Sequence, residues 1–225
     1  MTSQLISRIA EPELMEDMDQ ARAYAQADFT QPHNMFVEYY KQRLGMPDGG
    51  TFLDLGCGTA DITCRFAAAF PKIHLHGVDG SSAMLYFAKK TISSWNLADR
   101  IHLIKARLPL KDLPIQTYDG IISNSLLHHL HDPLILWRTI KRWAPRNAPV
   151  FIMDLSRPDT KAKARKIVET YSGNEADILK RDFFNSLLAA FRPDEIEKQL
   201  VQEGLDYLHI ETVSDRHFIV WGHLE

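Results

Sequence analysis

The sequence has few of the features that mark secreted, membrane-spanning or nucleic-acid-binding proteins. Its 225 residues include two cysteines, Cys57 and Cys64, which are too few for a disulfide framework. No apolar run approaches the roughly 20 residues that a membrane span requires, and residues 1–10 have no basic start followed by an apolar core. We therefore expect a cytoplasmic protein that neither crosses nor binds a membrane.

An excess of basic charge is also absent. The chain has 26 Lys and Arg residues against 29 Asp and Glu residues, and its formal net charge is -3 with a pI of about 6.4. Such a surface has no general attraction for nucleic acid or anionic lipid, so neither is an expected partner. Hydrophobic residues make up 45% of the sequence, enough for one core, and alternating strand and helix signals favour a single α/β domain over residues 1–225.

The most informative stretch is a short apolar run that ends in two glycines. Residues 51–61 read Thr-Phe-Leu-Asp-Leu-Gly-Cys-Gly-Thr-Ala-Asp, and a helical pattern follows at once. This pattern predicts a strand, a tight turn at Gly56 and Gly58, and a helix N-terminus. Because glycine has no Cβ, the turn leaves bare backbone for a ligand, as nucleotide-binding turns do.

Three acidic residues restrict the kind of nucleotide. Dinucleotide enzymes usually carry a third glycine where this chain has Asp61, and a pyrophosphate there would be repelled. Asp54, before the turn, suits an ammonium group better than a phosphate. Asp79 ends the next predicted strand, residues 73–79, where it can accept hydrogen bonds from ribose hydroxyls. The expected ligand carries a ribose, a cationic amino group and no phosphate.

The hexapeptide at residues 54–59 followed by Asp79 resembles the class I S-adenosylmethionine-dependent methyltransferases that act on small molecules, of the UbiE and methyltransferase type 11/12 kind. The resemblance runs from about Phe52 to the C-terminus. It implies an α/β, Rossmann-like, doubly wound seven-stranded sheet with an antiparallel last strand, helices on both faces and an N-terminal helical cap. The implied cofactor is S-adenosyl-L-methionine, with S-adenosyl-L-homocysteine as product.

The resemblance also implies a set of cofactor-binding positions. Asp54 and the backbone of the glycine turn would hold the methionine portion, and Asp79 the ribose. No acid follows the third strand, so backbone groups of Arg107 and Leu108 would contact adenine, although a solvated arginine is the competing interpretation. The expected cofactor-binding residues are Asp54, Gly56, Cys57, Gly58, Asp79, Gly80, Ser81, Arg107, Leu108 and Asn124.

The loop at residues 124–133 follows the fourth predicted strand and should face the transferred methyl group, because parallel sheets place their chemistry at the carboxyl ends of strands. It lacks the Pro-Pro-aromatic run expected of DNA amino-group methylases and resembles the Leu-His-His pattern of small-molecule enzymes. His129 and His128 are the candidate bases for a protonated acceptor, against the simpler interpretation that they line the cofactor pocket. We expect no metal site.

Four segments are expected in order: the cap at 1–48, with helices at 11–27 and 33–44; the cofactor-binding core at 49–159; inserted helices over the acceptor at 160–204; and an antiparallel C-terminal hairpin at 205–225. Each segment is predicted to contribute residues that contact the methyl acceptor. The competing interpretations of these residues are helix packing, loop ion pairs and turn contacts. These candidates are Tyr24, His33, Asp154, Arg157, Asp182, Asn185, Arg216 and His217.

The prediction is therefore an O- or N-methyltransferase that acts on a small molecule. The sequence leaves open whether the protein forms a homodimer. One rival is a protein that senses the cofactor without catalysis or that needs a partner subunit. The other is a nicotinamide-dependent oxidoreductase, which Asp61 disfavours.

Overall fold

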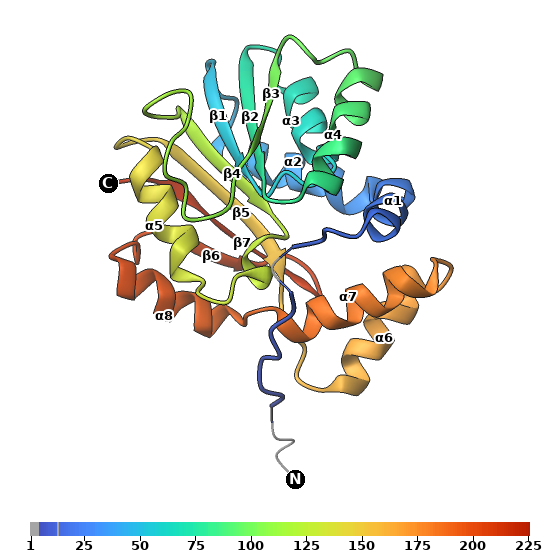
Figure 1. Cartoon of the computed structure of the whole chain (residues 1–225). Helices are drawn as coiled ribbons and strands as arrows, with labels where there is room; N and C mark the ends of the chain where they lie inside the picture. Colours follow the sequence, from blue (N-terminus) through green and yellow to red (C-terminus); the bar gives the residue numbers. More distant parts are fainter. Residues whose placement is uncertain (1–4, 13) are drawn as a thin grey trace.

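The computed structural model describes residues 5–12 and 14–225, and its centre is a seven-stranded sheet (Figure 1). Strands β1 to β5 are mutually parallel, and β7 runs antiparallel between β5 and β6, so the predicted fold class is confirmed. The sheet order is β3-β2-β1-β4-β5-β7-β6. The strands are β1 (Gly50–Leu55), β2 (Ile73–Asp79), β3 (Ile101–Lys105), β4 (Gly120–Asn124), β5 (Pro149–Leu155), β6 (His209–Thr212) and β7 (His217–His223).

Helices cover both faces of this sheet. They are α1 (Met18–Gln26), α2 (Thr30–Leu44), α3 (Asp61–Ala69), α4 (Ser82–Ser94), the 3₁₀ turn η1 (Leu127–His129), α5 (Leu134–Trp143), α6 (Lys161–Ser172), α7 (Asp177–Ala189) and α8 (Pro193–Glu203). None of the helices in the described ranges combines the length and the hydropathy of a bilayer span.

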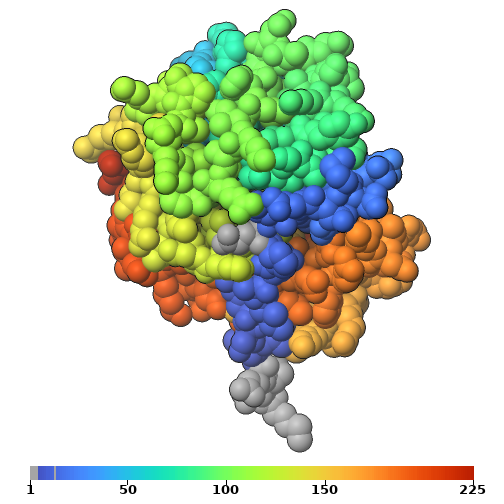
Figure 2. Space-filling view, in the orientation of Figure 1, coloured from blue at the N-terminus to red at the C-terminus, as the bar shows by residue number. Residues whose placement is uncertain are grey.

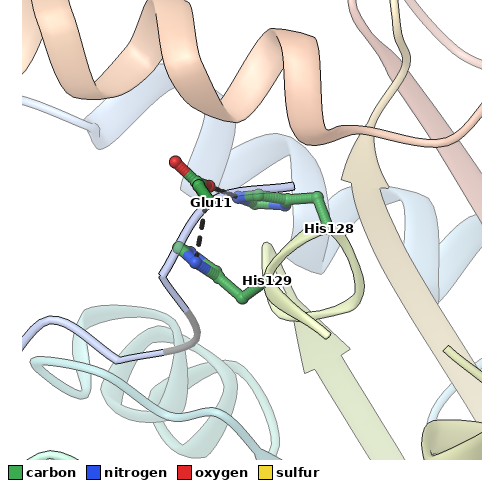
Figure 3. Close-up of side chains that lie close together, drawn as sticks. All are labelled: Glu11, His128 and His129. Atoms are coloured by element: carbon green, nitrogen blue, oxygen red, sulfur yellow. Dashed lines mark ion pairs between the residues drawn. The ribbon is translucent and has the colours of Figure 1, made fainter. Parts of the chain in front are cut away.

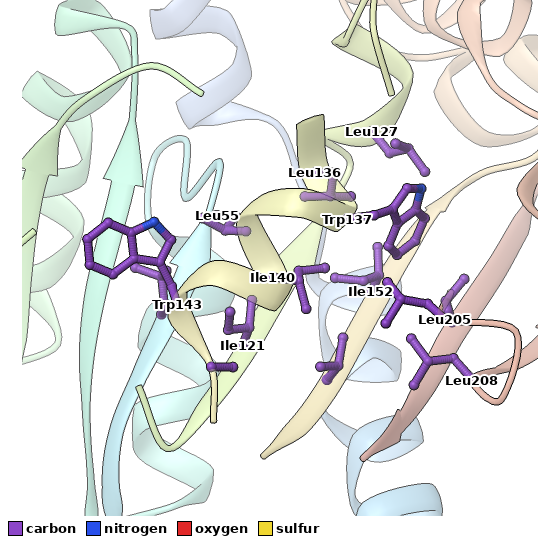
Figure 4. Packing of buried hydrophobic residues seen from close by; sticks show 14 of the residues in the cluster. Leu55, Ile121, Leu127, Leu136, Trp137, Ile140, Trp143, Ile152, Leu205 and Leu208 are labelled. Carbon is purple, nitrogen blue, oxygen red and sulfur yellow. The ribbon is translucent and has the colours of Figure 1, made fainter. Parts of the chain in front are cut away.

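The hydrophobic core divides into two layers because successive strand residues point to opposite faces. In β5, Phe151 and Met153 pack with α2 and α3, whereas Val150 and Ile152 pack with α5 and α8. Figure 4 shows the second layer, in which α5 lies over the sheet. Central strands buried on both faces are typical of a parallel sheet, and they hold the carboxyl ends of β1, β2, β4 and β5 in a fixed row.

Local capping explains where several helices begin and end. Ser81 Oγ accepts a hydrogen bond from the Met84 amide at 3.1 Å, which starts α4 as predicted. Asp17 caps α1 by accepting from the amides of Asp19 and Gln20. Gly204 ends α8 with φ +67°, a conformation that costs glycine little.

The predicted first helix begins too early. Residues 11–17 precede α1, and in residues 5–12 the backbone is instead held by other parts of the chain: the Ile6 amide donates to Asp159 O and the Ile9 amide to Leu188 O. Arg8 adds hydrogen bonds to the carbonyls of His128, Leu130 and Ala189. This N-terminal segment, residues 5–12, runs between the region of α5 and helix α7 (Figure 2).

Two other boundaries differ from prediction. Helix α2 begins at Thr30 instead of His33, because Pro32 falls in its first turn, where an amide hydrogen is not needed. Strand β6 covers only His209–Thr212 of the predicted stretch 205–213, because Leu205 and Leu208 pack against the core outside the strand.

Candidate active site

A cavity of about 510 Å³ lies at the carboxyl ends of the parallel strands. Residues of the predicted cofactor turn, the loop after β4, α1, α2, α7 and the start of β7 line it. Sixteen predicted site residues are among them: Tyr24, His33, Asp54, Gly56, Cys57, Gly58, Asp79, Gly80, Arg107, Leu108, Asn124, His128, His129, Asp182, Arg216 and His217. A volume of this size suits a cofactor with a small molecule, since ligand pockets measure roughly 300–1,000 Å³.

The glycine turn has the geometry that its sequence predicts. The amides of Gly56 and Cys57 both donate to Val78 O, which ties the turn to β2. Gly56 has φ +73°, and a Cβ on it would lie 2.9 Å from the Leu126 side chain. Gly58 has φ +53°, and a Cβ there would meet nothing within 4 Å. Gly56 is therefore required by packing, whereas Gly58 leaves backbone open to the cavity.

Asp79 ends β2 with both carboxylate oxygens engaged by backbone. Oδ2 accepts from the Gly58 amide at 2.9 Å, and Oδ1 accepts from the Ser81 amide at 2.8 Å. Burial raises the pKa of this carboxyl against the lowering effect of those hydrogen bonds. Each oxygen keeps a second lone pair, so the side chain can still accept from ligand hydroxyls.

Asp54 is the most perturbed carboxyl of the turn. It is buried, and Oδ2 accepts a hydrogen bond from Thr63 Oγ1 at 2.5 Å. Burial raises its pKa to about 7, and the charge of Asp79 acts in the same direction. A buried acid with this pKa favours a cation as its neighbour, because a positive charge would offset the loss of hydration.

Cys57 and Arg107 occupy different environments. Burial raises the pKa of the Cys57 thiol well above its usual value, so this residue remains a small neutral group beside Gly77. The Arg107 guanidinium is two-thirds exposed and pairs with Glu16 at 3.0 Å. The Arg107 side chain therefore lies in solvent, which agrees with the alternative interpretation of this residue as a solvated arginine.

On the opposite side of the cavity, Asp154 lies behind His128. Asp154 Oδ1 is 2.5 Å from His128 Nδ1, and Oδ2 accepts from the Leu127 amide at 2.7 Å. Although burial lowers the pKa of His128, the charges of Asp154 and Glu11 raise it overall. Burial alone would raise the pKa of Asp154, but the charge and hydrogen bond of His128 lower it overall. Asp154 therefore fixes the imidazole orientation, with Nε2 turned away from it.

His129 has a different environment in the same loop. Its Nδ1 lies 3.4 Å from both Pro12 O and Glu11 Oε1. Burial, and then the charge of His128, lower its pKa to about 3, so the imidazole is neutral. Of the two histidines, His128 has the oriented ring that a base requires.

Helices α1 and α2 bring Tyr24 and His33 to the cavity. Burial raises the pKa of Tyr24 to about 12. His33 Nδ1 is 2.6 Å from Asp61 Oδ2, which also accepts from Arg65 Nε at 2.7 Å. Burial raises the Asp61 pKa, but these two partners lower it overall. Asp61 thus places a carboxylate at the N-terminus of α3, where a dinucleotide enzyme would bind phosphate.

Asp182, Arg216 and His217 also line the cavity. Asp182 Oδ2 accepts from Gln20 Nε2 at 2.7 Å, and the Arg216 guanidinium lies 3.2 Å from the centre of the Tyr171 ring. Burial, and then Arg216, lower the pKa of His217 to about 4. The hairpin therefore reaches the cavity mouth, as its predicted antiparallel direction requires.

Four predicted positions lie outside the cavity wall. Ser81 caps α4, and Asp154 acts through His128. The Arg157 side chain is buried outside the cavity wall, where its guanidinium donates to Ala190 O, Ile6 O and Glu195 Oε1. Asn185 is exposed on α7. The structure therefore does not bring Arg157 and Asn185 to the cavity wall, and their substrate roles stay predictions.

Glu11 is the residue that sequence reasoning missed. It was expected inside a helix, yet its carboxylate lies 3.4 to 3.5 Å from the two histidines (Figure 3). A signal was available, because Glu11 precedes Pro12 and a residue before proline disfavours the helical conformation. Nothing in the sequence indicated that Glu11 would pair with His128 and His129, which lie more than 115 positions away.

Known proteins resemble this chain in sequence and in fold. Residues 53–150 match the family model described as a methyltransferase domain. The chain is 28% identical over 116 residues to (S)-coclaurine N-methyltransferase of Thalictrum flavum, covering 52% of this chain and 32% of that protein. It is 28% identical over 120 residues to malonyl-[acyl-carrier protein] O-methyltransferase of Halalkalibacterium halodurans, covering 53% of this chain and 44% of that protein. The chain thus spans less than half the length of these two relatives.

The fold comparison covers more of the chain. The crystal structure of a SAM-dependent methyltransferase from Aquifex aeolicus superposes with a TM-score of 0.69 at 17% identity, over 93% of this chain and 99% of that one. The sequence match covers the glycine turn and strands β1 to β4, and the fold match covers more of the chain than that. Residues 53–150 thus match a methyltransferase domain, and the chain as a whole has the fold of the SAM-dependent methyltransferase from Aquifex aeolicus.

Proposed function

We propose that this protein binds S-adenosyl-L-methionine and methylates a small-molecule acceptor, at oxygen or nitrogen. The observation that carries the proposal is the cofactor turn, where open glycine backbone adjoins two buried acids, Asp54 and Asp79. The cofactor supplies a methyl group on a cationic sulfur; the acceptor lone pair forms the new bond to carbon, the carbon–sulfur bond breaks, and the acceptor releases its proton.

The residues of the turn suit the three parts of this cofactor. Asp54 lines the cavity, and a cationic ammonium group beside it would favour its ionised form. The backbone at Gly58 is open to the same cavity. The spare lone pairs of Asp79 suit ribose hydroxyls. Arg107 and Leu108 also line the cavity, and their backbone is the proposed contact of adenine. Asp61 repels a phosphate at the N-terminus of α3, which favours this cofactor over a dinucleotide.

The acceptor side is the part of the cavity lined by the loop after β4, α1, α2, α7 and the start of β7. Tyr24, His33, Asp182, Arg216 and His217 are the proposed contacts. These groups orient the acceptor, and positioning alone can contribute about 7–11 kcal/mol to such a reaction. His128, which Asp154 orients, is the better candidate for proton removal than His129.

Both relatives named above are methyltransferases, one named for nitrogen and the other for oxygen, so neither decides the acceptor atom. The cytoplasmic location, the absence of a nucleic-acid partner and the single-domain organisation with its four segments stay predictions, as does the homodimer. A non-catalytic sensor would use the same cofactor turn, and an assay for product separates it from an enzyme.

Isothermal titration with S-adenosylhomocysteine and, separately, with NADH tests the cofactor. We expect binding of the thioether and none of NADH; the reverse result would remove the proposal. Incubating the protein and metabolite extracts with methyl-labelled S-adenosylmethionine tests catalysis, and we expect label in a small-molecule product. The Asp79→Ala variant serves as the control, since it should lose that product together with cofactor affinity.

A further inference from the structure

Three potential metal ligands meet beside the proposed acceptor position. Glu11 comes from the N-terminal segment, and His128 and His129 come from the loop after β4 (Figure 3). Glu11 Oε1 lies 3.5 Å from His128 Nε2 and 3.4 Å from His129 Nδ1, and all three ligand atoms lie within 4.8 Å of one another. The side chains are 12%, 3% and 15% exposed in the same order.

These separations suit a shared ion better than direct hydrogen bonds. A hydrogen bond between nitrogen and oxygen measures roughly 2.7–3.2 Å, which is shorter than both contacts of Glu11. Nitrogen and oxygen ligands at about 2.0–2.2 Å from a tetrahedral ion are separated from each other by roughly 3.3–3.6 Å. The two contacts of Glu11 fall in that range.

Each of two ligands is already oriented by a partner behind it. The Asp154 carboxylate lies against His128 Nδ1, which leaves Nε2 directed toward Glu11. Ser186 Oγ donates to Glu11 Oε1 at 2.9 Å. A carboxylate behind a histidine is the usual outer partner of a metal-binding imidazole, because it fixes the ring and increases its basicity.

The local charge also favours a cation. Glu11 and Asp154 contribute two carboxylates that pair with His128, and Asp182 lines the same cavity as the two histidines. An opposing charge is Arg8, whose guanidinium bonds to the carbonyls of His128, Leu130 and Ala189 and lies 4.1 Å from the centre of the Phe191 ring. These hydrogen bonds of Arg8 therefore go to backbone carbonyls and not to the ligand atoms of Glu11 and the two histidines.

We propose that Glu11, His128 and His129 bind one divalent transition-metal ion, such as Zn²⁺, which holds the deprotonated heteroatom of the methyl acceptor. Two imidazoles and one carboxylate suit Zn²⁺ or Fe²⁺ better than Mg²⁺ or Ca²⁺, which prefer oxygen ligands. Three protein ligands leave a coordination position open. This role for the ion rests on the proposed methyl transfer, whereas the metal site itself does not. It replaces the expectation of a site without metal.

The ion changes the task of His128. With Nε2 bound to metal, that nitrogen has no lone pair for a proton, so the acceptor loses its proton to water when it binds the ion. The metal-bound anion then keeps the lone pair that forms the bond to the methyl carbon.

Cobalt(II) is the probe that tests the site, because its visible absorption reports nitrogen and oxygen coordination. Protein freed of metal with a chelator is titrated with CoCl₂, by absorption and by calorimetry, and Zn²⁺ is then added as competitor. We expect one tightly bound equivalent with the intense visible absorption of a four- or five-coordinate ion, and displacement by Zn²⁺.

Four variants identify the ligands. Glu11→Gln and His129→Asn should each weaken Co²⁺ binding by more than about 100-fold, and Asp154→Asn, which removes only the outer partner, by about 10- to 100-fold. The matched controls Glu197→Gln and His74→Asn change exposed residues on α8 and β2 and should bind as the unaltered protein does. Absence of the Co²⁺ signal, or equal affinity in Glu11→Gln and the controls, overturns the proposal.

Calorimetry with S-adenosylhomocysteine on the same samples keeps the two proposals apart. Glu11→Gln should retain the unaltered cofactor affinity, which also shows that the variant is folded. Thioether binding without Co²⁺ binding rejects the metal site alone. Co²⁺ binding without thioether binding rejects the proposed function and leaves the metal site in place.

Discussion

Asp54→Asn should change how the stability of the protein depends on pH. Burial raises the pKa of Asp54 from its usual 3.8 to about 7. The folded state therefore binds a proton more tightly than the unfolded state, so stability from this group is present below about pH 4 and is lost as pH rises through about 7. The shift corresponds to roughly 4 kcal/mol in total. Asparagine keeps an acceptor for Thr63 and never ionises, so the variant avoids this loss.

The assay is urea unfolding of the ligand-free protein at several pH values. Between pH 5 and pH 8 the free energy of unfolding of Asp54→Asn, relative to the unaltered protein, should increase by about 2–3 kcal/mol. Asp99→Asn, which removes an exposed carboxyl, is the matched control and should show no such increase. Parallel pH profiles for Asp54→Asn and the unaltered protein would refute the reasoning.

Ligand binding gives an independent test of the protonation of Asp54. A cationic ammonium group beside Asp54 favours the ionised form, so S-adenosylhomocysteine should release a proton as it binds below about pH 7. Calorimetry in buffers of different ionisation enthalpy measures that proton. The unaltered protein should release it and Asp54→Asn should not; equal proton release by both would place the ammonium group elsewhere.

Three further substitutions test other parts of the account. Asp79→Ala should weaken S-adenosylhomocysteine binding by about 10- to 100-fold in calorimetry, since it removes a charged acceptor, and an unchanged dissociation constant would contradict the ribose assignment. His129→Ala removes a proposed metal ligand, so it should slow methyl transfer by about 100-fold or more with little change in cofactor affinity, and normal turnover would exclude it from the reaction. Arg157→Met should destabilise the fold by about 3 kcal/mol, because it leaves Glu195 and Ala190 O without their donor. If this last variant stays as stable but loses acceptor affinity, the structural role of Arg157 is wrong.

The part of the site that the sequence could predict is the part made by neighbouring residues. Gly56, Gly58 and Asp54 lie within five positions of one another, and a strand followed by a turn and a helix N-terminus admits few arrangements. Asp79 was predictable because parallel strands end at one edge of the sheet. The same rule brought the loop after β4 and the start of β7 to the cavity.

The rest depends on contacts between distant residues. Arg157 follows β5 at the correct edge, but Glu195 and two carbonyls from distant segments engage its guanidinium, so a strand-end position alone did not predict these partners. Residues 11–17 favour a helix by composition, yet hydrogen bonds at Ile6, Arg8 and Ile9 hold the preceding backbone to other elements and bring Glu11 to the histidines. Tertiary hydrogen bonds outweighed local propensity there.

A crystal structure with S-adenosylhomocysteine bound would test the central claim most directly. The account predicts ribose hydroxyls on Asp79, the methionine portion along Gly56 to Gly58 with its ammonium group toward Asp54, and the sulfur facing His128 across the cavity. A vacant turn in crystals saturated with the thioether, or a ligand that places phosphate beside Asp61, would contradict it.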